Sequence, residues 1–277
     1  MSDLLRVSLV QGNTRWHDPA GNREYYGELI APLLGQTDLI ILPETFTSGF
    51  SNDAIEQAEG EMGPTVDWMR EQAARMDAAL TGSVQVRAAD GVYNRMYFVH
   101  PDGDVSHYDK RHLFRYGREH ERYAPGKRRL IVNYRGWKIC PLVCYDLRFP
   151  VFSRNGFDAA TNASDYDLVI YTANWPAVRR YPWVQLAKAR AIENLAYVAC
   201  VNRVGVDGNE LEYSGDSAVY DFKGMPVAAT AEYAEQVVTA TLSRTALNEF
   251  REHFPAMLDA DAFELRDVID ENFGAEQ

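Results

Sequence analysis

Two short apolar runs in distant parts of the chain resemble each other. Residues 38–44 read DLIILPE, and residues 167–173 read DLVIYTA. Both runs are too short for a buried helix, and they lack the alternation of apolar and polar residues that marks a half-exposed strand. Strands of this kind are buried on both faces, so each must lie in a sheet that is covered on both sides. The pair therefore predicts two similar halves, each a mixed sheet with helices on one face.

The segments around these runs supply the expected helices and hairpins. Helices are expected from Asp18 to Gly35, from Pro64 onward, and over residues 180–194 and 243–254. Further strands and hairpins are expected over residues 4–11, 80–100, 129–143, 196–204, 216–230 and 235–242. Stacking the two sheets gives an α/β fold, a four-layer α-β-β-α sandwich of two mixed β-sheets. We expect one domain over residues 1–277, because no linker or low-complexity block interrupts the chain.

Charge and cysteine content exclude several classes of protein. The chain carries 28 basic and 40 acidic residues, a net charge of −12, whereas binding to nucleic acid needs a basic face. Three cysteines without a framework spacing indicate a reducing compartment. We see no signal peptide, and no apolar run approaches the ~20 residues of a membrane span. We therefore expect a cytoplasmic globular protein that binds neither nucleic acid nor membrane.

A third apolar run ends in a thiol. Residues 138–144 read KICPLVC, and the chain continues as YDLRFP. A buried strand with this ending can carry Cys144 to the edge of a sheet, and ligands bind at the carboxyl ends of strands in open α/β sheets. However, a free cysteine in an apolar run is most often a small core residue. On this stretch alone, both interpretations remain open.

Glu44 and Lys110 would complement a reactive thiol. A thiol with a pKa of ~8.5 needs a base or a nearby cation to become a thiolate. Glu44, at the end of one buried run, could take that proton and later give it to a leaving amine. Lys110, in a long charged loop over residues 109–126, could stabilise an oxyanion together with the backbone N–H of Tyr145. Considered singly, a carboxylate at a strand end and a lysine in a charged loop are more often surface charges.

The motifs around these three residues resemble those of the nitrilase superfamily of carbon–nitrogen hydrolases. LPE at 42–44, YDKRHL at 108–113 and LVCYDLRFP at 142–150 have the order and spacing of that family, and the resemblance extends from Val7 to about Val227. It implies the α-β-β-α sandwich, a dimer, and hydrolysis of non-peptide carbon–nitrogen bonds through a thioester without metal or cofactor.

The resemblance also implies roles for individual residues. Glu44, Lys110 and Cys144 correspond to the catalytic Glu-Lys-Cys triad of the family. A second carboxylate, expected to hold Lys110 and position the substrate, maps to Glu119, with Glu121 as the near alternative. Residues 180–194 are the expected dimer face.

Within the family, DLRFP at 146–150 and YTANWP at 171–176 look most similar to the ω-amidase branch. That branch hydrolyses α-ketoglutaramate and α-ketosuccinamate and releases ammonia. These small amides carry a carboxylate far from the scissile amide, and a cationic side chain should bind it. The candidates are Arg148, Arg115, Arg118 and Arg180. Arg148 is an equal candidate for a structural ion pair. Phe46, Tyr145 and Trp175 are expected to wall the pocket or to pack in the core.

Other kinds of protein remain possible within this fold. The alternatives are a nitrilase, an N-carbamoyl amidase, or a non-catalytic member that acts as a binding protein. Cys140 and Cys144 would lie roughly 13 Å apart on a strand, beyond the ~7 Å limit for a disulfide, so Cys140 is expected in the core. The six histidines have no ligand-pair spacing, so we expect no metal site. His112, inside a motif, is expected to organise its loop.

Overall fold

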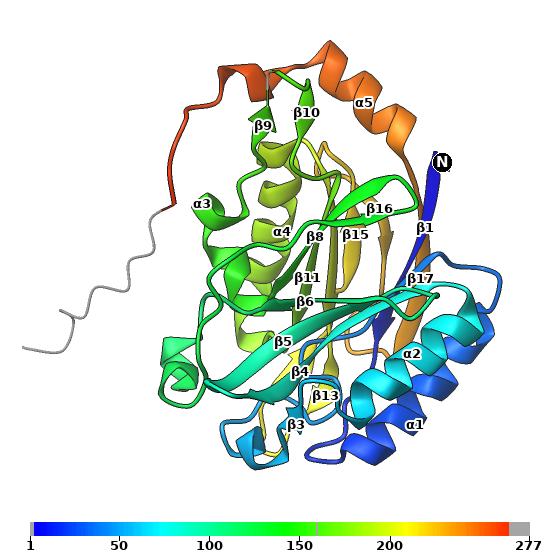
Figure 1. Cartoon of the computed structure of the whole chain (residues 1–277), viewed down its shortest axis with the longest axis vertical. Coiled ribbons are helices and arrows are strands. Elements are labelled where there is room, and N and C mark those ends of the chain that lie inside the picture. Colours follow the sequence, from blue (N-terminus) through cyan, green and yellow to red (C-terminus); the bar gives the residue numbers. More distant parts are fainter. Residues whose placement is uncertain (1–2, 159, 266–277) are drawn as a thin grey trace, which may run out of the picture.

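Two mixed β-sheets stack face to face in the computed structural model, which describes residues 3–158 and 160–265 (Figure 1). The first sheet has the strand order β17-β1-β2-β4-β5-β6, with β3 beside β4. Its strands are β1 (Leu4–Gln11), β2 (Leu39–Ile41), β3 (Glu59–Gly60), β4 (Ala79–Ala88), β5 (Gly91–Val99), β6 (Val105–Asp109) and β17 (Gln236–Ser243). Strands β1, β2 and β4 are parallel, and antiparallel strands flank them.

The second sheet repeats this design with the order β16-β15-β12-β11-β8-β7. Its strands are β7 (Val132–Tyr134), β8 (Trp137–Val143), β11 (Leu168–Ala173), β12 (Tyr197–Asn202), β15 (Ala218–Tyr220) and β16 (Pro226–Ala229). Here β8, β11 and β12 form the parallel centre. Two short antiparallel pairs lie outside both sheets: β9 (Phe157–Asp158) with β10 (Ala163–Ser164), and β13 (Val204–Val206) with β14 (Glu212–Ser214).

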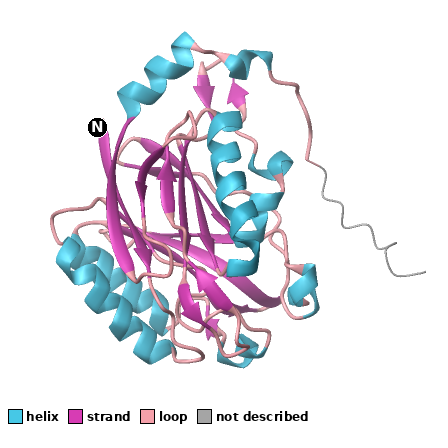
Figure 2. Cartoon of the chain, turned by 180° about the vertical axis from the view of Figure 1, so that it is seen from behind, coloured by secondary structure: helices cyan, strands magenta, loops and turns pink. Residues whose placement is uncertain are grey.

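Helices cover the outer face of each sheet (Figure 2). Helices α1 (Pro19–Ile30) and α2 (Pro64–Met76) pack on the first sheet, and α4 (Arg180–Asn194), with the short α3 (Pro150–Ser153) nearby, lies on the second. Helix α5 (Arg244–His253) lies at one end of the sandwich. The predicted four-layer α-β-β-α sandwich is therefore confirmed. Within residues 3–158 and 160–265, every helix falls short of a membrane span in length or apolar character.

Successive side chains along a strand point to opposite faces of its sheet, and this alternation divides the core into layers. In β1, Leu5, Val7 and Leu9 point into the space between the two sheets, whereas Val10 joins the layer beneath α1 and α2. The central strands β8 and β11 are buried on both faces, which explains their continuous apolar sequences. Burial on both faces holds the carboxyl ends of these parallel strands at one fixed edge.

Some predicted boundaries were wrong for local reasons. The run over residues 38–44 forms only the three-residue β2, because the chain turns after Leu42. The helix that begins after Asp18 ends at Ile30 rather than at Gly35, since Pro32 lacks the N–H group that would continue it. Strand β6 and the β13–β14 pair were not predicted.

Candidate active site

Cys144 lies at the point where β8 ends. The strand stops at Val143, and Cys144 begins a short 3-10 turn, Cys144–Arg148, with a φ of 43°. Few residues other than glycine adopt this left-handed conformation, and a residue that does so needs support from its surroundings. Asp146 provides the support, because its Oδ2 accepts hydrogen bonds from the Val143 N–H at 3.0 Å and the Tyr108 hydroxyl at 2.8 Å. The end of β8 is thereby fixed to β6 of the other sheet.

Asp146 also fixes the loop that follows β6. Its Oδ1 accepts a hydrogen bond from the backbone N–H of His112 at 3.0 Å and lies 2.7 Å from His112 Nδ1. The imidazole stacks on the ring of Phe149, with centroids 3.9 Å apart. His112 therefore organises its loop, as predicted from the sequence, and holds the segment of Lys110 against that of Cys144.

Lys110 is positioned through its own backbone. Its N–H donates to the carbonyl of Asn94 at 2.9 Å, and its carbonyl accepts from the N–H of Gly126 at 2.9 Å. A Cβ atom at position 126 would lie 1.9 Å from the backbone oxygen of Asp109. Only glycine therefore allows the chain to approach this closely beside Lys110.

Gly126→Ala is expected to disturb both stability and the site. The methyl group would force the backbone around Asp109 and Lys110 apart, so we expect the free energy of unfolding to fall by about 3–5 kcal/mol. Gly60→Ala is the matched control, because an added Cβ there meets no atom within 4 Å. Denaturant unfolding measures both variants, and equal stability of the two would contradict this account of Gly126.

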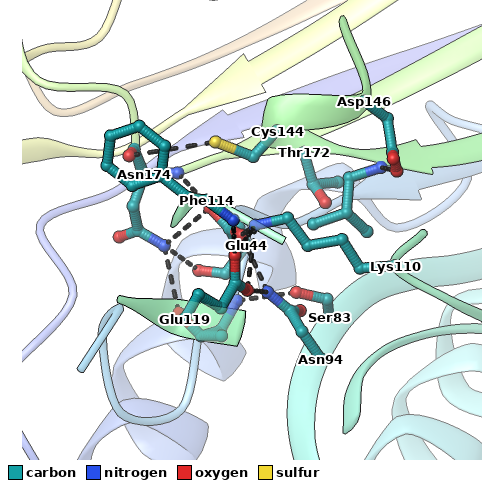
Figure 3. A network of polar contacts seen from close by, with 12 residues as sticks. Glu44, Ser83, Asn94, Lys110, Phe114, Glu119, Cys144, Asp146, Thr172 and Asn174 are labelled. Atoms are coloured by element: carbon teal, nitrogen blue, oxygen red, sulfur yellow. Dashed lines mark hydrogen bonds and ion pairs between the residues drawn. The ribbon is translucent and has the colours of Figure 1, made fainter. Parts of the chain in front are cut away.

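The Lys110 ammonium lies between two buried carboxylates (Figure 3). Its Nζ is 2.9 Å from Oε1 of Glu44 and 3.0 Å from a carboxylate oxygen of Glu119. Asn94 donates from Nδ2 to the same Glu44 oxygen at 2.8 Å. The side chains of Lys110, Glu44 and Glu119 are each at most 1% exposed. The two carboxylates thus compensate the buried ammonium and fix its position.

Asn174 joins Glu44 to the thiol. The other Glu44 oxygen, Oε2, accepts the backbone N–H of Asn174 at 2.7 Å, and Asn174 Nδ2 donates to the Glu44 carbonyl at 2.7 Å. The carbonyl oxygen of Asn174 lies 4.0 Å from Cys144 Sγ. Asn174 follows β11, so the edges of both sheets meet here. Asn174 lies in the motif YTANWP at 171–176, and its role in holding Glu44 was not predicted from the sequence.

Burial and charge shift the acidities of these groups. Burial disfavours the ammonium of Lys110, but Glu119 and Glu44 outweigh it and raise the pKa of Lys110 well above its ordinary value. Burial also raises the pKa of Cys144, and the neighbouring Glu44 raises it further. The pKa of Glu119 is raised by burial, although Lys110 opposes the shift. At neutral pH Lys110 is therefore an ammonium, and the resting Cys144 is a thiol that needs a base.

Glu44, Lys110 and Cys144 line one cavity of about 430 Å³. Glu119 is not in its wall and lies behind Lys110. The exposed Glu121, the near alternative to Glu119, pairs with Arg118 instead. Aromatic and aliphatic side chains make up much of the remaining lining, which comprises Phe50, Ser51, Asn52, Phe114, Tyr116, Gly117, Tyr145, Arg148, Asn174, Trp175, Pro176, Val178, Arg179, Asp207, Asn209, Leu211 and Tyr213.

Three of the four predicted pocket residues line this cavity, namely Tyr145, Trp175 and Arg148. The placement of Phe46 in the pocket wall was wrong. Phe46 is buried between the first sheet and its helices, with its ring centroid 5.6 Å from that of Tyr26 and 5.8 Å from that of Trp68. Thr45 has a φ of 41° and turns the chain immediately after Glu44, which directs Phe46 away from the cavity.

The β13–β14 pair supplies a wall that sequence reasoning missed. Asp207, Asn209, Leu211 and Tyr213 come from this pair and its turn. The Asp207 carboxylate accepts hydrogen bonds from the N–H groups of Asn209 and Leu211 and from the Tyr213 hydroxyl, at 2.8–3.0 Å. The only sequence signal was the turn over residues 205–208. Among the described residues, no group of three or more His, Cys, Asp or Glu side chains could hold a metal ion.

Comparison with known proteins agrees with this geometry. Residues 6–252 match the carbon-nitrogen hydrolase family. The chain belongs to this family. It is therefore a hydrolase of carbon–nitrogen bonds, and the predicted membership of the nitrilase superfamily is confirmed.

Several relatives of this carbon–nitrogen hydrolase share most of its length. Omega-amidase YafV of Escherichia coli K12 is 46% identical over 94% of this chain and 98% of its own. The 2-oxoglutaramate amidase of Bacillus subtilis is 30% identical over 91% of this chain and 96% of its own. The crystal structure of XC1258 from Xanthomonas campestris, a CN-hydrolase superfamily protein with an arsenic adduct in its active site, superposes with a TM-score of 0.94. It is 62% identical and covers 96% of this chain and 100% of its own.

Proposed function

We propose that this hydrolase is an ω-amidase, which converts small dicarboxylate monoamides such as α-ketoglutaramate or α-ketosuccinamate into the acid and ammonia. The observation that carries the proposal is the convergence of Glu44, Lys110 and Cys144 on one cavity. The relatives named omega-amidase and 2-oxoglutaramate amidase favour this substrate class over others of the family.

In the first half of the reaction, the Cys144 sulfur attacks the amide carbon. The pKa of Cys144 is raised by burial and by Glu44, so the thiol must lose its proton during the attack. Glu44 is the base placed to take it, and its orientation is fixed by Lys110 and by the backbone of Asn174. The carbonyl oxygen becomes an oxyanion, which the Lys110 ammonium and the N–H of Tyr145 stabilise.

The tetrahedral intermediate then collapses. The carbon–nitrogen bond breaks, Glu44 gives its proton to the leaving amine, and ammonia departs, which leaves an acyl thioester on Cys144. A water molecule replaces the ammonia, and Glu44 takes a proton from it as it attacks the thioester carbon. The carbon–sulfur bond then breaks and releases the acid, and Glu44 returns its proton to the Cys144 sulfur.

Glu119 acts through Lys110 in this scheme. It does not line the cavity, and its carboxylate lies 3.0 Å from the Lys110 Nζ. Glu119 is held in turn by the Phe114 N–H at 2.5 Å. We therefore assign Glu119 as a positioning residue that keeps Lys110 charged and directed at the oxyanion.

A substrate panel tests the proposed activity against its alternatives. We expect ammonia release from α-ketoglutaramate with a kcat/KM at least about 100-fold above that for a simple nitrile or an N-carbamoyl amino acid, since the family alternatives require differently shaped transition states. Preference for the nitrile or the carbamoyl compound would assign another branch. Absence of ammonia release from all three would favour the non-catalytic alternative, a binding protein.

We also propose that the whole chain is a single domain, that it forms a homodimer in the cytoplasm and that α4 is the dimer face. Exposed Tyr181 and Ile192 on α4 support such a contact, because exposed apolar side chains that gather on one surface favour a protein partner. Light scattering of the purified protein would return the mass of one chain if the dimer were wrong.

A further inference from the structure

Two arginines in the cavity wall, Arg148 and Arg179, have no carboxylate partner among residues 3–158 and 160–265. The guanidinium carbon of Arg148 lies 4.9 Å from the centroid of the Trp175 ring. That of Arg179 lies 5.5 Å from the rings of both Phe114 and Tyr116. No ion pair or side-chain hydrogen bond with the described part of the chain uses either group. Their N–H donors are therefore available to a ligand.

The other charged side chains of the cavity are already satisfied. Lys110 is shared by Glu44 and Glu119, and the Asp207 carboxylate accepts three hydrogen bonds from its own hairpin. Among the charged side chains that line the cavity, the guanidinium groups of Arg148 and Arg179 therefore differ from the rest in having neither an ion pair nor a side-chain hydrogen bond within residues 3–158 and 160–265. A cavity wall with two such groups favours an anionic ligand, because guanidinium N–H donors match the geometry of a carboxylate.

The aromatic partners fix both groups without using their donors. A guanidinium that stacks on a ring keeps the N–H groups at its edge free. The Trp175 indole N–H donates to the backbone carbonyl of Arg179 at 2.8 Å, so the ring beneath Arg148 is also tied to the Arg179 backbone. The two arginines come from different turns, Cys144–Arg148 and Ala177–Arg179, that meet at the cavity.

The other arginines named as candidates lie elsewhere. Arg180 pairs with Asp216 at 2.6 Å and with Glu232 at 2.5 Å. Arg118 pairs with Glu121 at 2.9 Å, and Arg115 is exposed outside the cavity lining. Of the four candidates, only Arg148 lines the cavity, and Arg179 was not among them.

We propose that Arg148 and Arg179 form the subsite that receives the substrate carboxylate remote from the scissile amide. This inference rests on the proposed ω-amidase activity and extends it, because it explains why the cavity would prefer an amide that carries a free carboxylate to a neutral amide. The dicarboxylate product keeps the same carboxylate, so dicarboxylates such as 2-oxoglutarate compete with the substrate.

Substitution of each arginine tests the subsite. In Arg148→Gln and Arg179→Gln, kcat/KM for α-ketoglutaramate falls about 10- to 100-fold, mainly through KM, as expected for the loss of a charged hydrogen bond. For butyramide, which has no carboxylate, the fall in kcat/KM is much smaller in both variants. Arg115→Gln, a matched control outside the cavity, leaves both substrates unaffected. Arg179→Lys restores part of the loss, because it restores the charge.

A second measurement does not depend on turnover. Saturating 2-oxoglutarate slows the alkylation of Cys144 by iodoacetamide in the wild type and in Arg115→Gln, but it does so far less in the two cavity variants. The subsite would be overturned if kcat/KM fell equally for the charged and the neutral amide. It would also be overturned if 2-oxoglutarate protected Cys144 from alkylation as well in the variants as in the wild type. Failure of the wild type to release ammonia from α-ketoglutaramate would instead overturn the proposed activity, while the protection experiment would still report on the subsite.

Discussion

Cys144→Ala is expected to abolish amide hydrolysis, whereas Cys140→Ala is expected to retain it. Removal of the nucleophile eliminates the thioester route, and the loss of rate should be at least about a thousandfold. Cys140 lies on β8, four residues before Cys144, and is buried in the core beside β11, outside the cavity lining. Steady-state ammonia release from the two variants measures this difference.

Comparison of Cys144→Ala with Cys140→Ala separates the loss of the nucleophile from any loss of stability. Cys140 is fully buried and Cys144 is 9% exposed, so each variant loses a buried sulfur atom and should lose about 1 kcal/mol of stability. Thermal unfolding of both variants checks that expectation. Substantial activity in a folded Cys144→Ala protein would disprove the nucleophile assignment.

Lys110→Met is expected to lower both activity and stability. It leaves Glu44 and Glu119 buried without their shared cation, which should cost about 3–5 kcal/mol of folding free energy at neutral pH. It also removes a donor to the oxyanion, so kcat should fall by about 100- to 1,000-fold. Lys138→Met is a matched control, because its ammonium donates to the Ser164 carbonyl and forms no ion pair in the described part of the chain. Denaturant unfolding and ammonia release measure the two effects.

The stability loss in Lys110→Met should depend on pH. Burial already raises the pKa of Glu119, and the charge of Lys110 is the main influence that opposes this shift, so removal of Lys110 raises the pKa further. A carboxyl group whose pKa is higher in the folded state binds more protons there. Its contribution to folding stability is therefore most favourable below its pKa in the unfolded chain. That contribution declines as the pH rises toward its pKa in the folded protein. The free energy of unfolding of Lys110→Met should therefore be closest to that of the wild type in acid and furthest from it at neutral pH. An equal loss of stability at both pH values would contradict the buried group of Lys110 with Glu44 and Glu119.

The sequence contained strong signals for the central elements of the fold. The helix over residues 180–194 was predicted with the bounds that it has, because its apolar residues recur at helical spacing. The apolar runs that became β8 and β11 were recognisable, since strands buried on both faces have no polar positions. Strand β6 and the β13–β14 pair were missed because their residues alternate weakly and their positions depend on tertiary pairing.

At the site, the three motifs predicted the catalytic residues but not all of the residues that line the cavity. Glu44 and Cys144 follow apolar runs that were recognised as strands, so their convergence could be expected from the ends of the sheets. Lys110 was assigned to the site from its motif, because strand β6, which it follows, was missed. Phe46 was misplaced because the left-handed turn at Thr45 has no local signature in the sequence. Arg179 was overlooked because its position is set by stacking against Phe114 and Tyr116, which belong to a loop far away in the sequence.

The most direct test of the mechanism is the intact mass of the protein after rapid mixing with α-ketoglutaramate and an acid quench. We expect the wild-type chain to gain the mass of the substrate less one ammonia, with the adduct mapping to Cys144 and no adduct in Cys144→Ala. Ammonia release from a wild-type chain that shows no adduct at any mixing time, or an adduct that persists in Cys144→Ala, would contradict the thioester mechanism.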